Sequence, residues 1–196
     1  RWILRFGAFP VGRTLQGLVN CPGLRQVLVE PTARWIDPGH TVTDLIRADP
    51  TAFCQALLDQ LASTSAAAPA PWMEELRRLE EVAGDAPHLP VEARLIRQLI
   101  THAPAACPIF VGNSMVIRDV DSFTGCGAKP LDFQGNRGAS GIDGNLATAL
   151  GIAAARGRVI ALVGDLTAQH DLGSLAAARG LNALIVVFNN GGGGIF

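Results

Sequence analysis

Apolar and polar positions in the first 62 residues form short blocks whose spacing alternates between strand-like and helical. Apolar runs at 2–6 and 27–30 predict two strands. Apolar residues recur at helical spacing in 53–61, and the interval 13–19 can form a short helix after a proline turn. The pattern therefore predicts a strand, a helix, a strand, a turn and a helix, in that order.

The next stretch, 63–71 (STSAAAPAP), is small, uncharged and interrupted by proline. This composition is typical of a linker. We therefore expect part of an α/β domain in residues 1–62, a linker over 63–71 and a second domain in 72–196.

Two helical patterns, 72–82 and 91–102, open the second domain. From residue 107 onward, short apolar runs without strict alternation follow one another, as in strands that are buried on both faces. Strands are predicted at 109–111, 159–163 and 183–188, and helices at 115–121, 143–155 and 172–179. Strands that alternate with helices at this spacing predict parallel βαβ units, and hence an α/β fold with a doubly wound parallel sheet. Such sheets bind ligands at the carboxyl ends of their strands.

Composition limits the possible partners. Of the 196 residues, 48% are hydrophobic and 17% are charged, which suffices for a sizeable core and argues against disorder. The formal net charge of -1 gives no reason to expect a nucleic-acid partner. No apolar run reaches the length of a bilayer span and no signal peptide opens the chain, so we expect no membrane anchor.

The four cysteines, Cys21, Cys54, Cys107 and Cys126, are widely scattered and form no CxxC pair or Cys/His cluster. Reduced thiols and a cytoplasmic protein are therefore expected, rather than a disulfide framework or a zinc site. The chain begins within a predicted strand without an initiating Met and stops just after a glycine run. We expect it to be a piece of a longer protein, cut at both ends.

Two polar clusters follow neighbouring predicted strands. Gly164 and Asp165 end one strand, and the sequence NNGGGG, starting at Asn189, ends the next. Magnesium prefers oxygen ligands and commonly takes several of them from phosphate and water. The carboxylate of Asp165, the amide oxygen of Asn190 and the backbone carbonyl of Gly192 could supply three, while the glycines let the backbone approach a diphosphate. Each cluster alone is also an ordinary turn sequence.

Together the two clusters resemble the GDG…NN signature of thiamine-diphosphate enzymes, with Leu166 in place of the third glycine. GNSMVIR (112–118), NRGASGIDG (136–144) and GDLTAQHDL (164–172) resemble the family of 2-succinyl-5-enolpyruvyl-6-hydroxy-3-cyclohexene-1-carboxylate synthase (SEPHCHC synthase), in which that leucine is usual. The resemblance is closest over 109–196. It is looser over 1–60, where GAFPVGRTLQ resembles the family's middle domain.

The resemblance implies a thiamine-diphosphate-binding fold. Residues 72–196 would form the diphosphate- and metal-binding domain, truncated at its C-terminal end, and 1–62 would be part of the central α/β domain. The implied cofactors are thiamine diphosphate and Mg²⁺ or Mn²⁺. The implied enzyme is a transferase of menaquinone or phylloquinone biosynthesis that decarboxylates 2-oxoglutarate and adds the resulting succinic-semialdehyde unit to isochorismate. It would be a homodimer or a dimer of dimers, with the active site at the subunit interface.

Arginine binds carboxylates through two parallel hydrogen bonds, and both implied substrates carry carboxylates. By resemblance, Arg118 and Arg137 would bind them, with Arg13 as a third contact, although Gly12 replaces the family's neighbouring lysine. Arg118 could instead pair with a neighbouring carboxylate, Asp119 or Asp121.

The remaining implied contacts lie in the turns. Asn113 and Ser114 border the thiamine and the bound intermediate by resemblance, and they could equally cap the following helix. Asp143 is predicted to cap the helix after it, and His170 lies near the metal site at most. By resemblance, Ile195 and Phe196 line the isochorismate side. The implied cofactor contacts are Ser114, Ile142, Gly164, Asp165, Leu166, Asn190 and Gly192.

Thiamine diphosphate needs an activating glutamate, and no glutamate here lies in a motif that resembles the family's. By resemblance that residue comes from an N-terminal domain of a partner subunit, so we expect no catalytic residue in this chain and no activity from it alone. Another thiamine-diphosphate enzyme, of the acetohydroxyacid synthase or 2-oxoacid decarboxylase type, fits NRGASGIDG and Leu166 less well. A non-catalytic diphosphate-binding module would leave the arginines unexplained. No GxGxxG motif supports a dinucleotide site.

Overall fold

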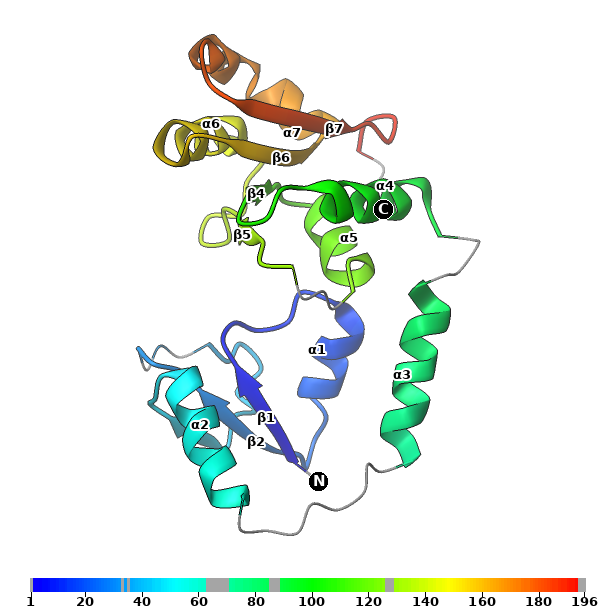
Figure 1. The fold of residues 1–196 in the computed structure, drawn as a ribbon, viewed down its shortest axis with the longest axis vertical. Helices are drawn as coiled ribbons and strands as arrows, with labels where there is room; N and C mark the ends of the chain where they lie inside the picture. Colours follow the sequence, from blue (N-terminus) through cyan, green and yellow to red (C-terminus); the bar gives the residue numbers. More distant parts are fainter. Residues whose placement is uncertain are drawn as a thin grey trace. The chain divides into compact units, whose positions relative to one another are not determined.

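The computed structural model of the chain describes residues 2–32, 34, 36–62, 71–84, 89–125 and 129–193. The chain divides into two compact units, residues 1–79 and 80–196 (Figure 1). The division falls within helix α3 (Pro71–Gly84). The predicted linker, 63–71, lies almost wholly outside the described residues, so the predicted boundary stays an expectation.

The first unit contains a three-stranded parallel sheet in the order β1-β2-β3. Strands β1 and β2 are labelled in Figure 1. Its elements are β1 (Trp2–Phe6), α1 (Arg13–Val19), β2 (Arg25–Val29), β3 (Asp44–Ile46) and α2 (Pro50–Leu61). The sequence predicted all of these except β3, whose three residues are too few to show a period. Helix α2 begins earlier than predicted, because the carboxylate of Asp49 accepts a hydrogen bond from the amide of Ala52 (3.0 Å) and caps it.

The second unit contains a four-stranded parallel sheet in the order β5-β4-β6-β7. Its strands are β4 (Pro108–Val111), β5 (Asp132–Gln134), β6 (Val159–Gly164) and β7 (Ala183–Phe188). Its helices are α4 (Val91–His102), α5 (Met115–Phe123), α6 (Asn145–Arg156), α7 (Asp165–His170) and the 3-10 helix η1 (Leu172–Ala178). The predicted α/β fold with parallel sheets is confirmed.

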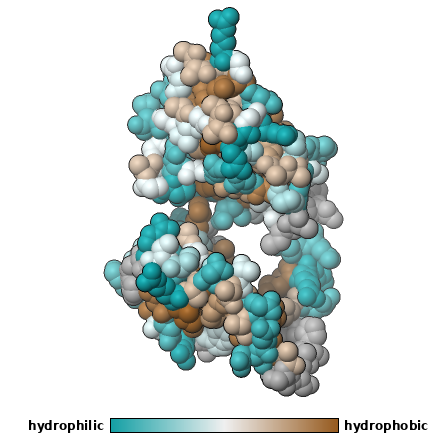
Figure 2. All heavy atoms as spheres, turned by 60° about the vertical axis from the view of Figure 1, so that its left-hand side comes forward, coloured by the Kyte–Doolittle hydropathy of each residue, from teal (hydrophilic) through white to brown (hydrophobic). Residues whose placement is uncertain are grey.

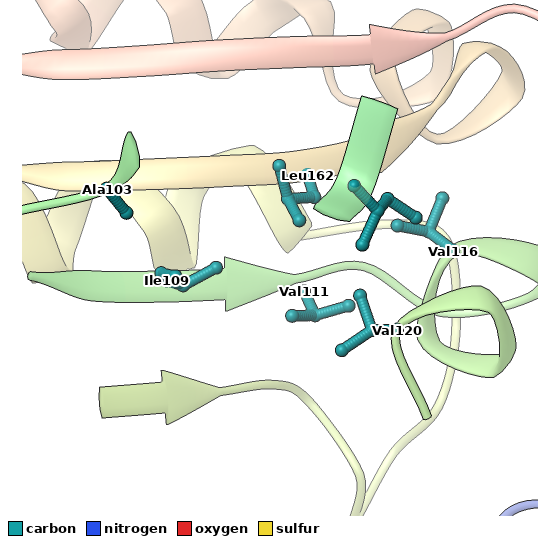
Figure 3. Close-up of a cluster of buried hydrophobic side chains, with 7 residues drawn as sticks. Ala103, Ile109, Val111, Val116, Val120 and Leu162 are labelled. Atoms are coloured by element: carbon teal, nitrogen blue, oxygen red, sulfur yellow. The ribbon is translucent and has the colours of Figure 1, made fainter. Parts of the chain in front are cut away.

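Successive residues of β4 and β6 point to opposite faces of this sheet, and each face carries its own core. Ile109 and Val111 of β4 and Leu162 of β6 pack with Ile96 of α4 and Val116 of α5. Figure 3 shows side chains of this cluster between the two strands and α5. On the other face, the core consists of Phe110, Leu146, Ala149, Ala153, Val159, Ala161 and Val163. Helices therefore cover both faces, which is the doubly wound arrangement.

Three details of the second unit differ from the prediction. Strand β5 was missed because it has three residues, of which only Phe133 is apolar. Helix α7 was missed, and the interval predicted as a helix at 172–179 is a 3-10 helix. Strand β7 was predicted to be buried on both faces, yet Leu184 and Val187 are 52% and 46% exposed. The reason is that β7 pairs with β6 on one side and is the last described strand of the sheet.

Hydrophobic side chains lie at the surface among hydrophilic ones (Figure 2), and Leu57, Leu58 and Leu61 of α2 are exposed. Among the described residues, no helix is both long enough and apolar enough to cross a membrane. Cys21, Cys54 and Cys107 are free thiols, while Cys126 lies outside the described residues.

Candidate functional site

A cavity lies at the carboxyl ends of β4, β6 and β7, which meet at one edge of the parallel sheet. Its volume is about 430 Å³. Helices α4 and α5 and the turns after the three strands contribute its lining. The predicted site residues in that lining are Asn113, Ser114, Ile142, Gly164, Asp165, Leu166 and Asn190. The structure therefore brings together residues that are up to 77 positions apart in the sequence, from Asn113 to Asn190.

The carboxylate of Asp165 joins the β6 turn to the glycine run after β7. One carboxylate oxygen accepts a hydrogen bond from the amide of Gly192 (2.8 Å), and the other accepts one from the amide of Leu166 (2.9 Å). Gly191, Gly192 and Gly193 all have φ between 76° and 85°, a conformation that side chains disfavour. Asp165 therefore lies next to the glycine run, as predicted. However, Gly192 directs its N–H, and not its carbonyl, toward the carboxylate.

The donor set at this edge fits a hard cation held together with a phosphate group. Asp165 supplies a carboxylate and Asn190 an amide group, and both line the cavity. No group of three His, Cys, Asp or Glu residues that could hold a metal occurs within the described part of the chain. A cation here would thus depend on oxygens from a bound ligand, as magnesium commonly does.

Asn113 joins the β4 turn to the NRGASGIDG segment. It is 3% exposed, and its amide nitrogen donates to the carbonyl of Gly141 (2.8 Å). Its amide oxygen accepts a hydrogen bond from the guanidinium of Arg137 (2.8 Å). The prediction that Asn113 caps helix α5 is wrong, because both ends of its side chain are used across the turn.

Ser114 precedes α5, but its side chain makes no capping hydrogen bond, so that prediction is also wrong. Its backbone has φ 69° and ψ -127°. Only glycine adopts this conformation at low cost, and a residue with a Cβ atom held there stores roughly 1–3 kcal/mol. Such strain is found mainly at functional sites, and Ser114 lines the cavity.

The predicted substrate arginines are exposed, and two of them, Arg118 and Arg137, donate hydrogen bonds to groups in the turns. Arg118 donates to the carbonyl of Ser114 (2.6 Å), and its predicted alternative, an ion pair with Asp119 or Asp121, does not occur among the described residues. Arg137 donates to Asn113. Arg13 opens α1 in the other unit. The predicted contacts Ile195 and Phe196 lie outside the described residues.

Ile142, the predicted support for the cofactor, lines the cavity and is 37% exposed. Helix α6 begins just after it, with Gly144 at the N-cap in the left-handed conformation. The prediction that Asp143 caps α6 is wrong. The cap comes from Asp171, whose carboxylate accepts hydrogen bonds from the amides of Leu146 (2.6 Å) and Ala147 (3.0 Å).

The pKa of Asp171 reflects this capping. Burial acts to raise it, but hydrogen bonds from Ser174 and from the two α6 amides outweigh burial and hold the pKa below its ordinary value. The role of Asp171 could not be predicted from the sequence, because Asp171 lies 25 positions beyond Leu146. Its only sequence signal was its place within GDLTAQHDL.

Two further carboxyl groups line the cavity, Glu92 of α4 and Asp119 of α5. Burial, and then the charge of Glu92, raise the pKa of Asp119, while Arg118 opposes the shift. Neither residue was predicted from the sequence to be part of the site. The cavity wall is thus acidic on the α4–α5 side, and the arginines of the turns lie outside its lining.

Comparison with known proteins shows which proteins this chain resembles. Residues 121–196 match the family described as "Thiamine pyrophosphate enzyme, C-terminal TPP binding domain". A SEPHCHC synthase of Dechloromonas aromatica is 49% identical over 196 residues, covering 100% of this chain and 35% of the relative. SEPHCHC synthases of Chloroflexus aurantiacus and Geobacillus thermodenitrificans are each 40% identical, over 99% of this chain and 35% and 34% of their own lengths.

The chain spans about a third of the length of these curated relatives. The family match covers the segment that contains Ile142, Asp165 and Asn190. The resemblance inferred from the motifs is confirmed: over its whole length this chain is similar to SEPHCHC synthases, and its residues 121–196 match a thiamine-pyrophosphate-binding domain of the C-terminal type.

Proposed function

We propose that the full-length protein containing this chain is a thiamine-diphosphate-dependent SEPHCHC synthase. It would decarboxylate 2-oxoglutarate and add the succinic-semialdehyde unit to isochorismate, in menaquinone or phylloquinone biosynthesis. The observation that carries the proposal is the hydrogen bond from the amide of Gly192 to the carboxylate of Asp165. Asp165 lines the same cavity as Asn190 and Ile142. Relatives with the SEPHCHC synthase name support it over the whole chain.

In this proposal the chain supplies the metal- and diphosphate-binding half of the active site. Asp165, Asn190 and the backbone at Gly192 would hold Mg²⁺ or Mn²⁺ together with the diphosphate. Gly164, Leu166 and Ser114 would contact the cofactor, and Ile142 would support its ring. When bound, thiamine diphosphate supplies the electron sink for decarboxylation.

The exposed arginines would bind the substrate carboxylates. A guanidinium has five N–H donors, and the contacts of Arg118 with Ser114 and of Arg137 with Asn113 each engage one nitrogen. The remaining donors of each can pair with a carboxylate in the two-pronged geometry. Because each contact fixes one side of the guanidinium, the direction of the free side is set before substrate binds.

The activating group of the site would lie outside this chain. We propose that the activating glutamate comes from another domain of a partner subunit, in a homodimer or a dimer of dimers whose active sites lie at the subunit interface. Arg13, Ile195 and Phe196 would add substrate contacts. A cytoplasmic protein is proposed, since the expected reduced thiols fit that compartment.

The first test is a titration of the full-length protein with thiamine diphosphate and Mg²⁺, repeated with Asp165→Ala. Loss of a ligand should weaken cofactor binding by about 100-fold or more, given that the loss of a group behind a metal ligand commonly costs about 10- to 100-fold. Asp49→Ala, which removes the cap of α2, is a matched control and should bind the cofactor normally. Unchanged affinity in Asp165→Ala would refute the metal site.

The second test identifies the reaction. The full-length protein is supplied with 2-oxoglutarate and isochorismate, and carbon dioxide and the coupled product are measured. Turnover of pyruvate in place of 2-oxoglutarate would favour another thiamine-diphosphate enzyme. Diphosphate binding that needs no Mg²⁺, with no turnover, would favour a non-catalytic binding module.

A further inference from the structure

Asp171 occupies a position that nothing in the proposed chemistry explains. It follows α7 directly, and its carboxylate accepts three hydrogen bonds. One carboxylate oxygen accepts from the amides of Leu146 (2.6 Å) and Ala147 (3.0 Å), and the other accepts from the hydroxyl of Ser174 (2.5 Å). The carboxylate therefore fastens the start of α6 to the segment between α7 and η1.

The amides that it binds have no cap within their own helix. The first turn of an α-helix leaves its N–H groups without partners inside the helix. Gly144 at the N-cap has no side chain to offer, and Asp143 makes no capping bond. Leu146 is 1% exposed, so its amide lies in a buried region and would be costly to leave unbonded.

Helix α7 links Asp171 to Asp165, the proposed metal ligand. It begins at Asp165 and ends at His170, and six residues of α-helix span about 9 Å. Thr167 is buried, Ala168 packs against the α6 core, and the amide of Asp171 donates to the carbonyl of Thr167 (3.2 Å). Helix α7 is thus short and packed, with Asp165 as its first residue and Asp171 directly after its last.

The start of α6, which Asp171 caps, follows closely after Ile142, the residue proposed to support the cofactor ring. Ile142 lies three residues before the first residue of α6, and it lines the same cavity as Asp165. Fixing the first turn of α6 to Asp171 therefore fixes the turn at Ile142 relative to Asp165. If the bond to α6 is lost, the two sides of the cavity are no longer tied at this point.

We propose that Asp171 is a positioning residue that sets the spacing between Ile142 and Asp165, so that the ring and the diphosphate of one cofactor are held at the same time. The role in cofactor binding rests on the proposed function. The tie between α6 and α7 does not, and it can be tested without any ligand.

The test uses the full-length protein with Asp171→Ala, Asp171→Asn and the control Asp49→Ala. Hydrogen exchange, followed by mass spectrometry without cofactor, should be faster in Asp171→Ala for peptides covering 141–150. Affinity for thiamine diphosphate with Mg²⁺ should fall by about 10- to 100-fold, the usual cost of losing a supporting group. Asn is as good a capping acceptor as Asp, so Asp171→Asn should retain affinity within about threefold.

The control separates positioning from general stability. Asp49→Ala also loses a helix cap, in residues 1–79, and should lower the melting temperature without changing cofactor affinity. Unchanged exchange in 141–150 for Asp171→Ala would refute the tie. Faster exchange with normal affinity would refute the positioning role, provided that Asp165→Ala has lost affinity.

If Asp165→Ala also binds normally, the proposed metal site is wrong, and the positioning role falls with it, while the exchange result still decides the tie. Should Asp171→Ala fail to fold, Ser174→Ala replaces it. That variant removes one of the three hydrogen bonds and should give a smaller change, about two- to fivefold in affinity. Normal exchange and affinity in Ser174→Ala would then refute the proposal.

Discussion

The strained backbone at Ser114 gives a prediction whose size follows from the structure. With φ 69° and ψ -127°, Ser114 holds its Cβ in a region that only glycine occupies readily. Strain of this kind costs about 1–3 kcal/mol, and glycine loses about 0.5–1 kcal/mol more conformational entropy on folding than other residues. Ser114→Gly should therefore raise the free energy of unfolding by about 0.5–2 kcal/mol.

The matched control is Ser114→Ala, which removes the hydroxyl and keeps the Cβ with its strain. No hydrogen bond of the Ser114 hydroxyl caps α5, so this variant should lie within about 0.5 kcal/mol of the parent protein. Urea denaturation of the full-length protein without cofactor, followed by fluorescence, measures both variants.

Activity measurements on the two variants separate the effect of the strained Ser114 backbone from the effect of its hydroxyl group. If the hydroxyl contacts the cofactor or the substrate, both variants lose the same amount of activity, while only Ser114→Gly gains stability. The reasoning is refuted if Ser114→Gly is no more stable than Ser114→Ala. A gain in stability would show that the fold tolerates strain at the cavity wall.

Two further predictions concern side chains around the same cavity. Asn113→Ala removes the hydrogen bonds to Gly141 and Arg137. It should lower the free energy of unfolding by about 1–2 kcal/mol and raise the KM for 2-oxoglutarate. Unchanged stability in urea would contradict the role of Asn113 as a connection between turns. Burial, and then Glu92, raise the pKa of Asp119 above its ordinary 3.8, so the folded state favours the protonated form and loses stability as the pH rises through this higher pKa. Asp119→Asn should therefore raise the urea midpoint at neutral pH, with a gain that shrinks as the pH falls toward 3.8, and a gain that does not depend on pH would count against this explanation.

Elements whose apolar residues recur with a clear period could be predicted from the sequence alone. Helix α4 and strand β7 begin and end at the predicted residues, because their apolar spacing is set within one segment. Strands β3 and β5 were missed, since three residues carry no period and form a strand only by pairing with a neighbour. The exposed side chains of β7 were missed for the same reason, because burial depends on which neighbours a strand has.

For the candidate site, the sequence was sufficient where a strand end and a motif coincide. Asp165 and Asn190 follow parallel strands that pair with each other, so their meeting at one edge followed from the strand-end rule. Which partner each polar side chain takes was a different matter. Asn113, Ser114 and Asp143 looked like helix caps, because capping preference is a local property.

The hydrogen-bond partners of these side chains depend on the three-dimensional packing of the chain. Asn113 bonds across to Gly141 and Arg137, and the cap of α6 comes from Asp171, 25 residues away from the amide that it binds. A hydrogen bond needs two groups within about 3 Å, and a one-dimensional pattern does not fix which distant groups reach that distance. The sequence therefore determined which residues gather at the edge of the sheet, and the packing of α6 against α7 decided how they are held there.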